Sequence, residues 1–216
     1  MTTLRADSPQ AIQDAVRETA IDGHLRALKM PGGLRHYRDL ARQARTDGQD
    51  VLGYLESVLA VELESRRNNQ IAQRLRDARF PYPRDLDGFD FAAAPSVNKK
   101  MVLELAGGRF VGEREGAILI GPSGTGKTYL AIAIGRAVIM AGYRTRYTTA
   151  MGLMNELLAA QSDHSVARVL RSWARYDLVV VDLCRSRNYA DTPSCRRWDP
   201  IAVVGAAGRD IMEGSA

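Results

Sequence analysis

The amino-acid sequence predicts an α/β domain that has a parallel sheet with helices on both faces and follows an N-terminal helical region. Three observations support this fold class. Apolar residues recur at intervals of three and four through residues 8–80, which is the period of a helix. From residue 101, apolar stretches of strand length alternate with helical ones, as they do where crossover helices connect parallel strands. A glycine-rich turn joins the first of these strands to the helix after it.

The composition is that of an ordinary folded, soluble protein. Of 216 residues, 45% are hydrophobic and 25% are charged. No apolar run approaches the ~18–20 residues that span a membrane, and the N-terminus, "MTTLRADSPQ", lacks the apolar core of a secretory signal. The two cysteines, Cys184 and Cys195, suit neither a zinc knuckle nor a disulfide framework, so we expect a cytoplasmic protein. A net charge of +5 permits a polyanionic partner without requiring one.

Residues 1–80 are the predicted helical region. Asp50 stands where an N-cap is expected. An apolar stripe at helical spacing follows it and comprises Val51, Tyr54, Leu55, Val58, Leu59, Leu63, Ile71 and Leu75. Arginines cluster in the second half of this helix, at Arg66, Arg67, Arg74, Arg76 and Arg79. Their positive charge suits phosphate groups, but a solvated helix face or pairing with acids of a neighbouring subunit accounts for them equally well.

Residues 81–100 are predicted to be a linker, because "PYPRDLDGFDFAAAPSVNKK" holds three of the eight prolines and few periodic apolar residues. Residues 101–182 then form the predicted α/β core. Helices are expected over 97–110, 127–141, 150–161 and 164–175, and strands over 117–121, 144–148 and 178–182. In the remaining segment, 183–216, only "IAVVGAA" is compatible with a short strand.

The segment "AILIGPSGTGKTYLAIAIG" carries the most specific pattern of the chain, G-x-x-x-x-G-K-[ST], known as Walker A. In this pattern successive backbone N–H groups and a helix N-terminus face phosphate oxygens. Lys127 would reach the β- and γ-phosphates, and the Thr128 hydroxyl would coordinate Mg²⁺. The expected binding residues are Gly121, Pro122, Ser123, Gly124, Thr125, Gly126, Lys127 and Thr128.

The flanks of this loop argue against a chance match. Residues 117–120 supply a strand before it, and Leu130, Ile134 and Val138 give the helix after it a buried stripe. Asp182 ends another apolar strand, at the edge where open α/β sheets bind ligands. We therefore expect Asp182 to hold the same magnesium ion through water; an Asp that merely ends a strand is the alternative.

Several quoted segments together resemble the IstB transposition helper ATPases, which are AAA+ P-loop NTPases related to the DnaC helicase loaders and the DnaA initiator. The similarity covers roughly residues 22–182 in unbroken order. The motifs that carry it are "VLGYLESVLAVELESRRNNQIAQRLRDARFP", "FDF", "GPSGTGKTYLAIAIG", "YRTRYTTA" and "YDLVVVD". The phosphate-loop pattern alone indicates only a P-loop protein, whereas the helical lead-in and "RYTTA" are far more specific.

The resemblance implies a function that the residues alone do not. Members of this family bind ATP between neighbouring subunits, assemble on duplex DNA and bend it, and recruit a transposase. It implies that the N-terminal helices serve self-association into oligomers and that Phe89 and Phe91 lie where the nucleotide base packs. Without the resemblance, such a pair of aromatic residues is more often a core anchor. It also places Arg144, Arg146 and Thr148 toward DNA. With the helix arginines whose charge suits phosphate groups, the candidate DNA-binding residues are Arg66, Arg67, Arg74, Arg76, Arg144 and Arg146.

The resemblance ends at Asp182. The family continues with a glutamate that polarises the attacking water, a sensor strand and an arginine that reaches a neighbour's γ-phosphate, whereas this chain continues "LCRSRNYADTPS". We therefore assign no catalytic residue, expect an incomplete sheet at the C-terminal end, and expect ATP binding with impaired hydrolysis. Our hypothesis is that residues 183–216 are out-of-frame sequence. The hypothesis fails if neither of the other two reading frames of the downstream DNA encodes an acidic residue and a sensor strand.

Three other functions stay open at this point. A DnaC-like helicase loader would use the same core but meet a helicase in place of a transposase. A non-catalytic, interfering subunit would join intact homologues through its N-terminal helices and bind DNA without turnover. A small-molecule P-loop kinase is the least favoured, because no lid or acceptor-binding residues are identifiable.

Overall fold

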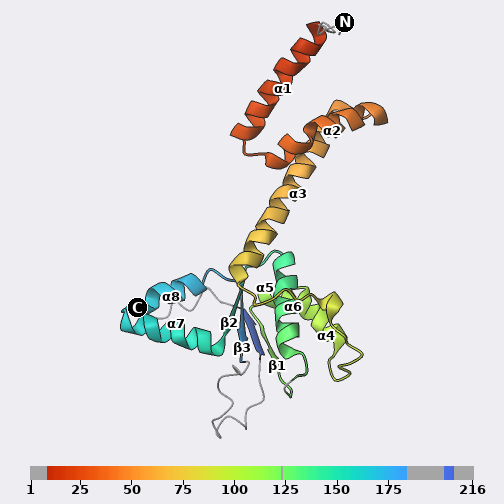
Figure 1. Ribbon diagram of the computed structural model, residues 1–216. Helices are drawn as coiled ribbons and strands as arrows, with labels where there is room; N and C mark the ends of the chain where they lie inside the picture. The colour runs from red at the N-terminus through yellow and green to blue at the C-terminus, as the bar shows by residue number, and fades with distance from the viewer. Residues whose placement is uncertain (1–8, 123, 184–201, 207–216) are drawn as a thin grey trace, which may run out of the picture. The chain divides into compact units, whose positions relative to one another are not determined.

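The computed structural model describes residues 9–122, 124–183 and 202–206 (Figure 1). The chain divides into two compact units, Met1–Gln70 and Ile71–Ala216, and each is described by itself. Among the described helices, none is both long enough and apolar enough to cross a bilayer.

The first unit contains helices α1 (Pro9–Ala27) and α2 (Pro31–Asp47) and the beginning of α3 (Val51–Ala78). The Asp50 carboxylate accepts a hydrogen bond from the Gly53 backbone N–H at 2.8 Å, which confirms the predicted N-cap of α3. Helix α1 is tied to α2 by Tyr37, whose hydroxyl donates to Asp22 at 2.7 Å. Helical periodicity over 8–80 therefore predicted the elements of this region correctly.

Glu62 of α3 joins α2 to α3 within the first unit. Its buried carboxylate accepts hydrogen bonds from the backbone N–H groups of Gly32 and Gly33, at 2.7 and 3.0 Å, in the first turn of α2. Arg66 donates to the other carboxylate oxygen at 2.7 Å. Gly32 must be small, because a Cβ there would lie 2.8 Å from Ser65 Cβ. Burial raises the pKa of Glu62, but the hydrogen bonds from Arg66, Gly33 and Gly32 outweigh burial and leave this pKa below its ordinary value.

Replacing Glu62 by glutamine is expected to destabilise the first unit by about 1–3 kcal/mol at neutral pH, because the charged acceptor of three hydrogen bonds is lost. The pKa of Glu62 is lower in the folded state, so its stabilising contribution is complete above the unfolded pKa of about 4.3 and is lost as the pH falls through the folded value. Thermal melts followed by circular dichroism, from neutral pH down to about 2 and thus well below the unfolded pKa, measure both effects. The exposed Glu64→Gln is the control, and equal melting of the two variants would contradict the role of Glu62.

The second unit is built on a four-stranded sheet in the order β1-β4-β3-β2. Its strands are β1 (Gly116–Leu119), β2 (Thr145–Thr149), β3 (Leu178–Asp182) and β4 (Ala202–Ala206). Strands β2 and β3 pair in parallel, and β4 pairs antiparallel with both β1 and β3. The three strands of the predicted core therefore point the same way, as an α/β sheet of the P-loop type requires.

Strand β4 confirms a strand within "IAVVGAA", and as an antiparallel strand it adds a mixed element to the parallel sheet that the sequence predicted. It lies between β1 and β3 and runs against both, in register over all five residues with β3. A strand can pair antiparallel with its neighbour without the right-handed crossover connection that parallel pairing needs. The alternation of helices and strands in the sequence therefore does not predict the antiparallel direction of β4. The rest of the segment after residue 183 lies outside the described residues.

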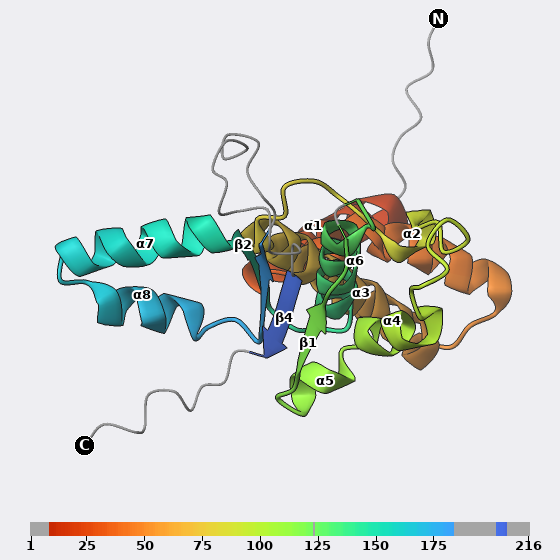
Figure 2. The same ribbon diagram turned by 90° about the horizontal axis from the view of Figure 1, so that it is seen from below.

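The helices of the second unit match the predicted ones except near residue 107. They are η1 (Leu86–Gly88), α4 (Lys99–Ala106), α5 (Arg109–Gly112), α6 (Lys127–Met140), α7 (Ala150–Ser162) and α8 (Val166–Trp173). The predicted single helix 97–110 is two, because Gly108 adopts the left-handed conformation with φ +76°. In both views α7 and α8 lie on one side of the sheet and α4 and α6 on the other (Figure 1, Figure 2).

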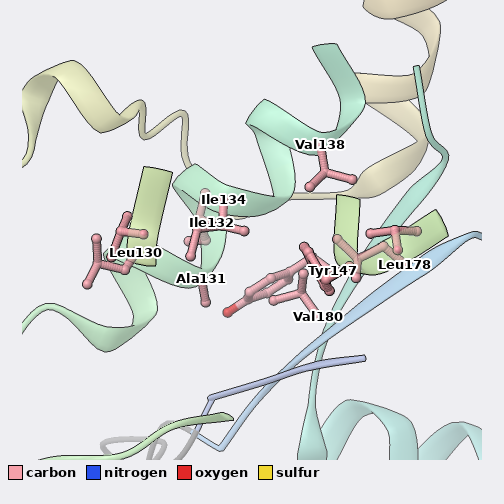
Figure 3. Packing of buried hydrophobic residues seen from close by; sticks show 11 residues of the cluster. Leu130, Ala131, Ile132, Ile134, Val138, Tyr147, Leu178 and Val180 are labelled. Atoms are coloured by element: carbon pink, nitrogen blue, oxygen red, sulfur yellow. The ribbon is translucent and has the colours of Figure 1, made fainter. Parts of the chain in front are cut away.

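The core of the second unit forms where α6 packs on the sheet. Figure 3 shows side chains of α6 facing Tyr147 of β2 and Leu178 and Val180 of β3. Ile134 and Val138, both predicted as core residues, are completely buried. The buried side chains of α6 in this cluster are Leu130, Ala131, Ile132, Ile134 and Val138. This packing fixes the start of α6, and with it the loop that precedes the helix, against the ends of the strands.

Candidate nucleotide-binding site

The predicted phosphate loop, residues 121–126, joins β1 to the N-terminus of α6. Gly124 and Gly126 have φ values of +83° and +85°, a conformation that residues with a side chain rarely adopt. These two glycines turn the chain sharply just before α6 begins at Lys127. The free backbone N–H groups of the first turn of this 14-residue helix suit an anion. Ser123, also predicted to line the loop, lies outside the described residues.

The Lys127 side chain folds back over the loop. Its ammonium group donates to the Pro122 carbonyl oxygen and, at 3.2 Å, to the Thr125 hydroxyl. The Thr125 hydroxyl in turn donates to the Pro122 carbonyl at 2.9 Å. Both acceptors of Lys127 are neutral, and a phosphate oxygen is a stronger acceptor for an ammonium group than either. The Lys127 ammonium group therefore lies over the loop, where the phosphates of a bound nucleotide would contact this group.

Thr128 and Asp182, the two residues predicted to share a magnesium ion, lie next to each other beside this loop. The Thr128 hydroxyl lies 3.2 Å from Asp182 Oδ1, although 54 residues separate them. Asp182 is only 3% exposed at the end of β3, and Tyr147 of β2 donates to its Oδ2 at 2.8 Å. A hydroxyl and a carboxylate are hard oxygen donors, which Mg²⁺ takes together with substrate phosphates. The residues present therefore fit Mg²⁺ bound with a nucleoside triphosphate.

No larger metal site competes with this pair in the part of the chain that the structure describes. There, no group of three or more His, Cys, Asp and Glu side chains is placed to hold a metal ion. A site with one carboxylate and one hydroxyl is incomplete for a metal ion by itself. The phosphates of a nucleotide would supply the missing oxygen ligands.

An aromatic cluster from the linker borders the phosphate loop. Phe89 lies so close to Gly126 that a Cβ on this glycine would be 2.7 Å from the Phe89 ring. Phe91 contacts Phe89 edge to face with 4.8 Å between ring centroids, and Tyr129 of α6 lies 5.4 Å from Phe89. Phe89 and Phe91 are half-buried against the core of the second unit. The structure thus brings Phe89 to the loop, with Phe91 behind it, and both also act as core anchors.

Asp85 fastens this part of the linker to α6. Its backbone carbonyl accepts a hydrogen bond from the Tyr129 hydroxyl at 2.9 Å, and its carboxylate pairs with Arg136 at 2.8 Å. The sequence pattern predicted neither these anchors nor a role for Tyr147. For Tyr147 a signal existed, because it lies in a predicted strand beside the strand that carries Asp182. For Asp85 the sequence offers none.

The two candidate DNA-binding arginines of the first unit differ in their surroundings. Arg66 is engaged within the unit, since it donates to Glu62 and to the Lys29 carbonyl oxygen at 3.1 Å. Arg67, the next residue, is exposed.

The other four candidate arginines lie in the second unit, and three of them have partners there. Arg74 donates to the Gly142 carbonyl and Arg76 to Gln73, at 2.6 Å in the second case. Arg146 donates to the Asp77 carbonyl at 3.2 Å, and it lies over the rings of Trp173 and Tyr176, 5.6 and 5.9 Å from their centroids. Arg144 is exposed, and its backbone N–H donates to Asp177 at 2.8 Å. Contacts with DNA remain a prediction for all six candidate arginines.

A strand, a glycine-rich loop, a helix and a facing acid at the end of a neighbouring strand define the nucleotide-binding site of a P-loop NTPase. Residues 23–190 of this chain match the model of one such family, described as IstB-like ATP binding protein. The chain belongs to this family, as the sequence motifs predicted, and the matched region runs a few residues beyond Asp182.

Similar proteins from several bacteria carry names that connect them with insertion sequences and with ATP binding. A protein of insertion sequence IS5376 from Geobacillus stearothermophilus is 30% identical over 86% of this chain and 77% of its own length. One from an insertion sequence of Mycobacterium tuberculosis is 31% identical over 92% of this chain and 79% of its own length. The protein of IS21 from Pseudomonas aeruginosa is 34% identical over 73% of this chain and 60% of its own length.

Proposed function

We propose that this chain binds Mg²⁺–ATP and serves as an ATP-binding helper protein of DNA transposition. The observation that carries the proposal is the contact between Thr128 and Asp182, at 3.2 Å, beside the phosphate loop. The loop glycines and the N-terminus of α6 would bind the phosphates, and Lys127 would pair with their charge. Thr128 and Asp182 would hold Mg²⁺, which screens the phosphate charge when bound. The names of the relatives support the connection with transposition.

Hydrolysis of ATP by this chain alone is proposed to be impaired. The residue after Asp182, where the family carries its catalytic glutamate, is Leu183, and this side chain can neither accept a proton nor orient water. Leu183 is 39% exposed next to a buried carboxylate. The chemistry that these residues support is thus the binding of ATP.

The test of ATP binding is a thermal melt of the purified chain with and without Mg²⁺–ATP. A ligand that binds only the folded state stabilises it by about 2.7 kcal/mol at a hundredfold excess over its dissociation constant. We expect a shift of this kind in the wild-type chain and its loss in Lys127→Ala, because the loop then lacks its only ammonium group. A wild-type chain that melts at the same temperature with and without Mg²⁺–ATP would overturn the proposed function.

We further propose that the chain self-associates, binds duplex DNA and recruits a transposase. Support for self-association comes from α3, where the first unit exposes leucines at helical spacing: Leu52, Leu55, Leu59 and Leu63. Such an apolar stripe is costly in water and is relieved when helices of two copies pack together. Support for DNA binding is the net charge of +5 together with exposed arginines such as Arg67 and Arg144.

The DNA proposal predicts an unequal effect of two arginine substitutions. Arg67→Gln is expected to weaken binding to a duplex oligonucleotide and to reduce the dependence of log K on log salt by about 0.9, the loss of one phosphate contact. Arg42→Gln is the control, since this arginine is exposed but pairs with Asp39 on the same helix. Fluorescence anisotropy at several salt concentrations measures both, and equal slopes for both variants would refute the role of Arg67.

A further inference from the structure

Tyr147 lies beside the proposed magnesium site but has no role in the function described so far. In the register of β2 and β3 it faces Val180, and because alternate residues of a strand share a face, it lies on the same side of the sheet as Asp182. Its side chain is 9% exposed, and its ring lies 5.9 Å from that of Phe80. The hydroxyl reaches past Val180 and donates to Asp182 Oδ2 at 2.8 Å.

The two oxygens of the Asp182 carboxylate have different surroundings. Oδ1 lies 3.2 Å from the Thr128 hydroxyl, on the side of the phosphate loop, whereas Oδ2 accepts a hydrogen bond from the Tyr147 hydroxyl. A carboxylate with one oxygen held in this way cannot rotate freely about its Cβ–Cγ bond. The hydrogen bond therefore keeps Oδ1 directed toward Thr128.

The chemistry of the donor also matters. A phenol is neutral at physiological pH, so it fixes the carboxylate without cancelling the negative charge that a cation requires. An arginine or lysine at position 147 would satisfy the buried acid equally well, but it would compete electrostatically with the metal ion. Groups that hydrogen-bond to a ligating carboxylate in this way orient it and tune its affinity for the metal.

We propose that Tyr147 is a positioning residue, whose hydroxyl holds the Asp182 carboxylate in the orientation that receives the Mg²⁺ of bound Mg²⁺–ATP. This inference rests on the proposed function, since it concerns the same site. The proposal distinguishes the binding of the nucleotide from the binding of its metal ion. The phosphate loop binds the nucleotide itself, and the Tyr147–Asp182 pair determines how tightly the metal ion is held.

The experiment uses Mn²⁺, which electron paramagnetic resonance detects directly, as a probe for the metal site. Mn²⁺ is titrated into the full chain with ATP bound, and the affinity for ATP is measured separately by calorimetry in EDTA. For Tyr147→Phe we expect Mn²⁺ binding about 10-fold weaker or more, with unchanged affinity for metal-free ATP. Tyr143→Phe is the control, because this tyrosine also packs against the core but lies beside Gly108 and Gly112.

A double-mutant cycle with Asp182→Asn gives an independent readout. If Tyr147 acts through Asp182, Tyr147→Phe causes no further loss of Mn²⁺ affinity once Asp182 is replaced. Independent, additive losses would overturn the inference, and so would equal Mn²⁺ affinities for Tyr147→Phe and Tyr143→Phe. A Tyr147→Phe chain without a cooperative melt would also overturn it, because the hydroxyl would then serve the fold. A wild-type chain that binds ATP neither with nor without metal would refute the proposed function itself.

Discussion

Replacing Gly126 by alanine is expected to abolish the thermal stabilisation that Mg²⁺–ATP gives the chain. Gly126 has φ +85°, and a Cβ at this position would lie 2.7 Å from Phe89 Cε2. The left-handed conformation costs roughly 1–2 kcal/mol for a residue with a side chain. The collision adds to this cost, because the ring is also held by Phe91 and Tyr129. Alanine therefore forces either the phosphate loop or the aromatic cluster out of place.

Gly124→Ala is the matched control for this prediction. Gly124 has nearly the same φ, +83°, but nothing lies within 4 Å of a Cβ built there. The two variants share the backbone strain and differ in the collision with Phe89. Melts with and without Mg²⁺–ATP are expected to show a reduced shift for Gly124→Ala and none for Gly126→Ala. If both variants keep the same shift, the contact with Phe89 does not shape the loop.

Replacing Ile134 by alanine is expected to lower the free energy of unfolding by about 2–5 kcal/mol. Ile134 lies in the middle of α6, is 0% exposed and belongs to the core cluster between this helix and the sheet. Removing three of its carbon atoms leaves a cavity that close-packed neighbours cannot fill. Urea denaturation of the second unit measures the change.

Ile118→Ala is the control for the substitution in the core. Ile118 is also an isoleucine in the second unit, on β1, but its side chain is 61% exposed. The same atoms are removed there without creating a cavity, so the effect on the free energy of unfolding is expected to stay within about 0.5 kcal/mol. Equal losses for the two isoleucines would contradict the position of the core.

The sequence was most informative where a local pattern and a buried face coincide. The glycine pattern, the preceding strand and the apolar stripe of α6 all indicated one strand–loop–helix unit, and the structure contains it. Asp182 was predictable for a similar reason: four apolar residues precede a single acid, so the strand must end buried with its carboxylate at the ligand-binding edge.

Other features depend on contacts between distant segments, which no local pattern encodes. The break at Gly108 in the predicted helix 97–110 is the exception, because the pair Gly107–Gly108 is a local signal for it that the continuing apolar period hides. The arginines of α3 looked alike in the sequence, yet Arg66 is engaged with Glu62 and Arg67 is exposed. The direction of β4 and the hydrogen bond between Tyr147 and Asp182 likewise arise only when separate strands meet.

The place of β4 has a consequence for the order in which the second unit folds. Strand β1, which leads into the phosphate loop, is connected to β3 and Asp182 in the sheet only through β4. The pairing of Leu119 with Ala202 closes a loop of roughly 80 residues, a slow and entropically costly step. Within the sheet, the phosphate loop and Asp182 are thus joined only by this long-range pairing, whereas outside the sheet α6 packs directly on β3. A bound nucleotide would contact the phosphate loop directly and Asp182 through its metal ion. During folding it would therefore link the same two segments that β4 links in the sheet.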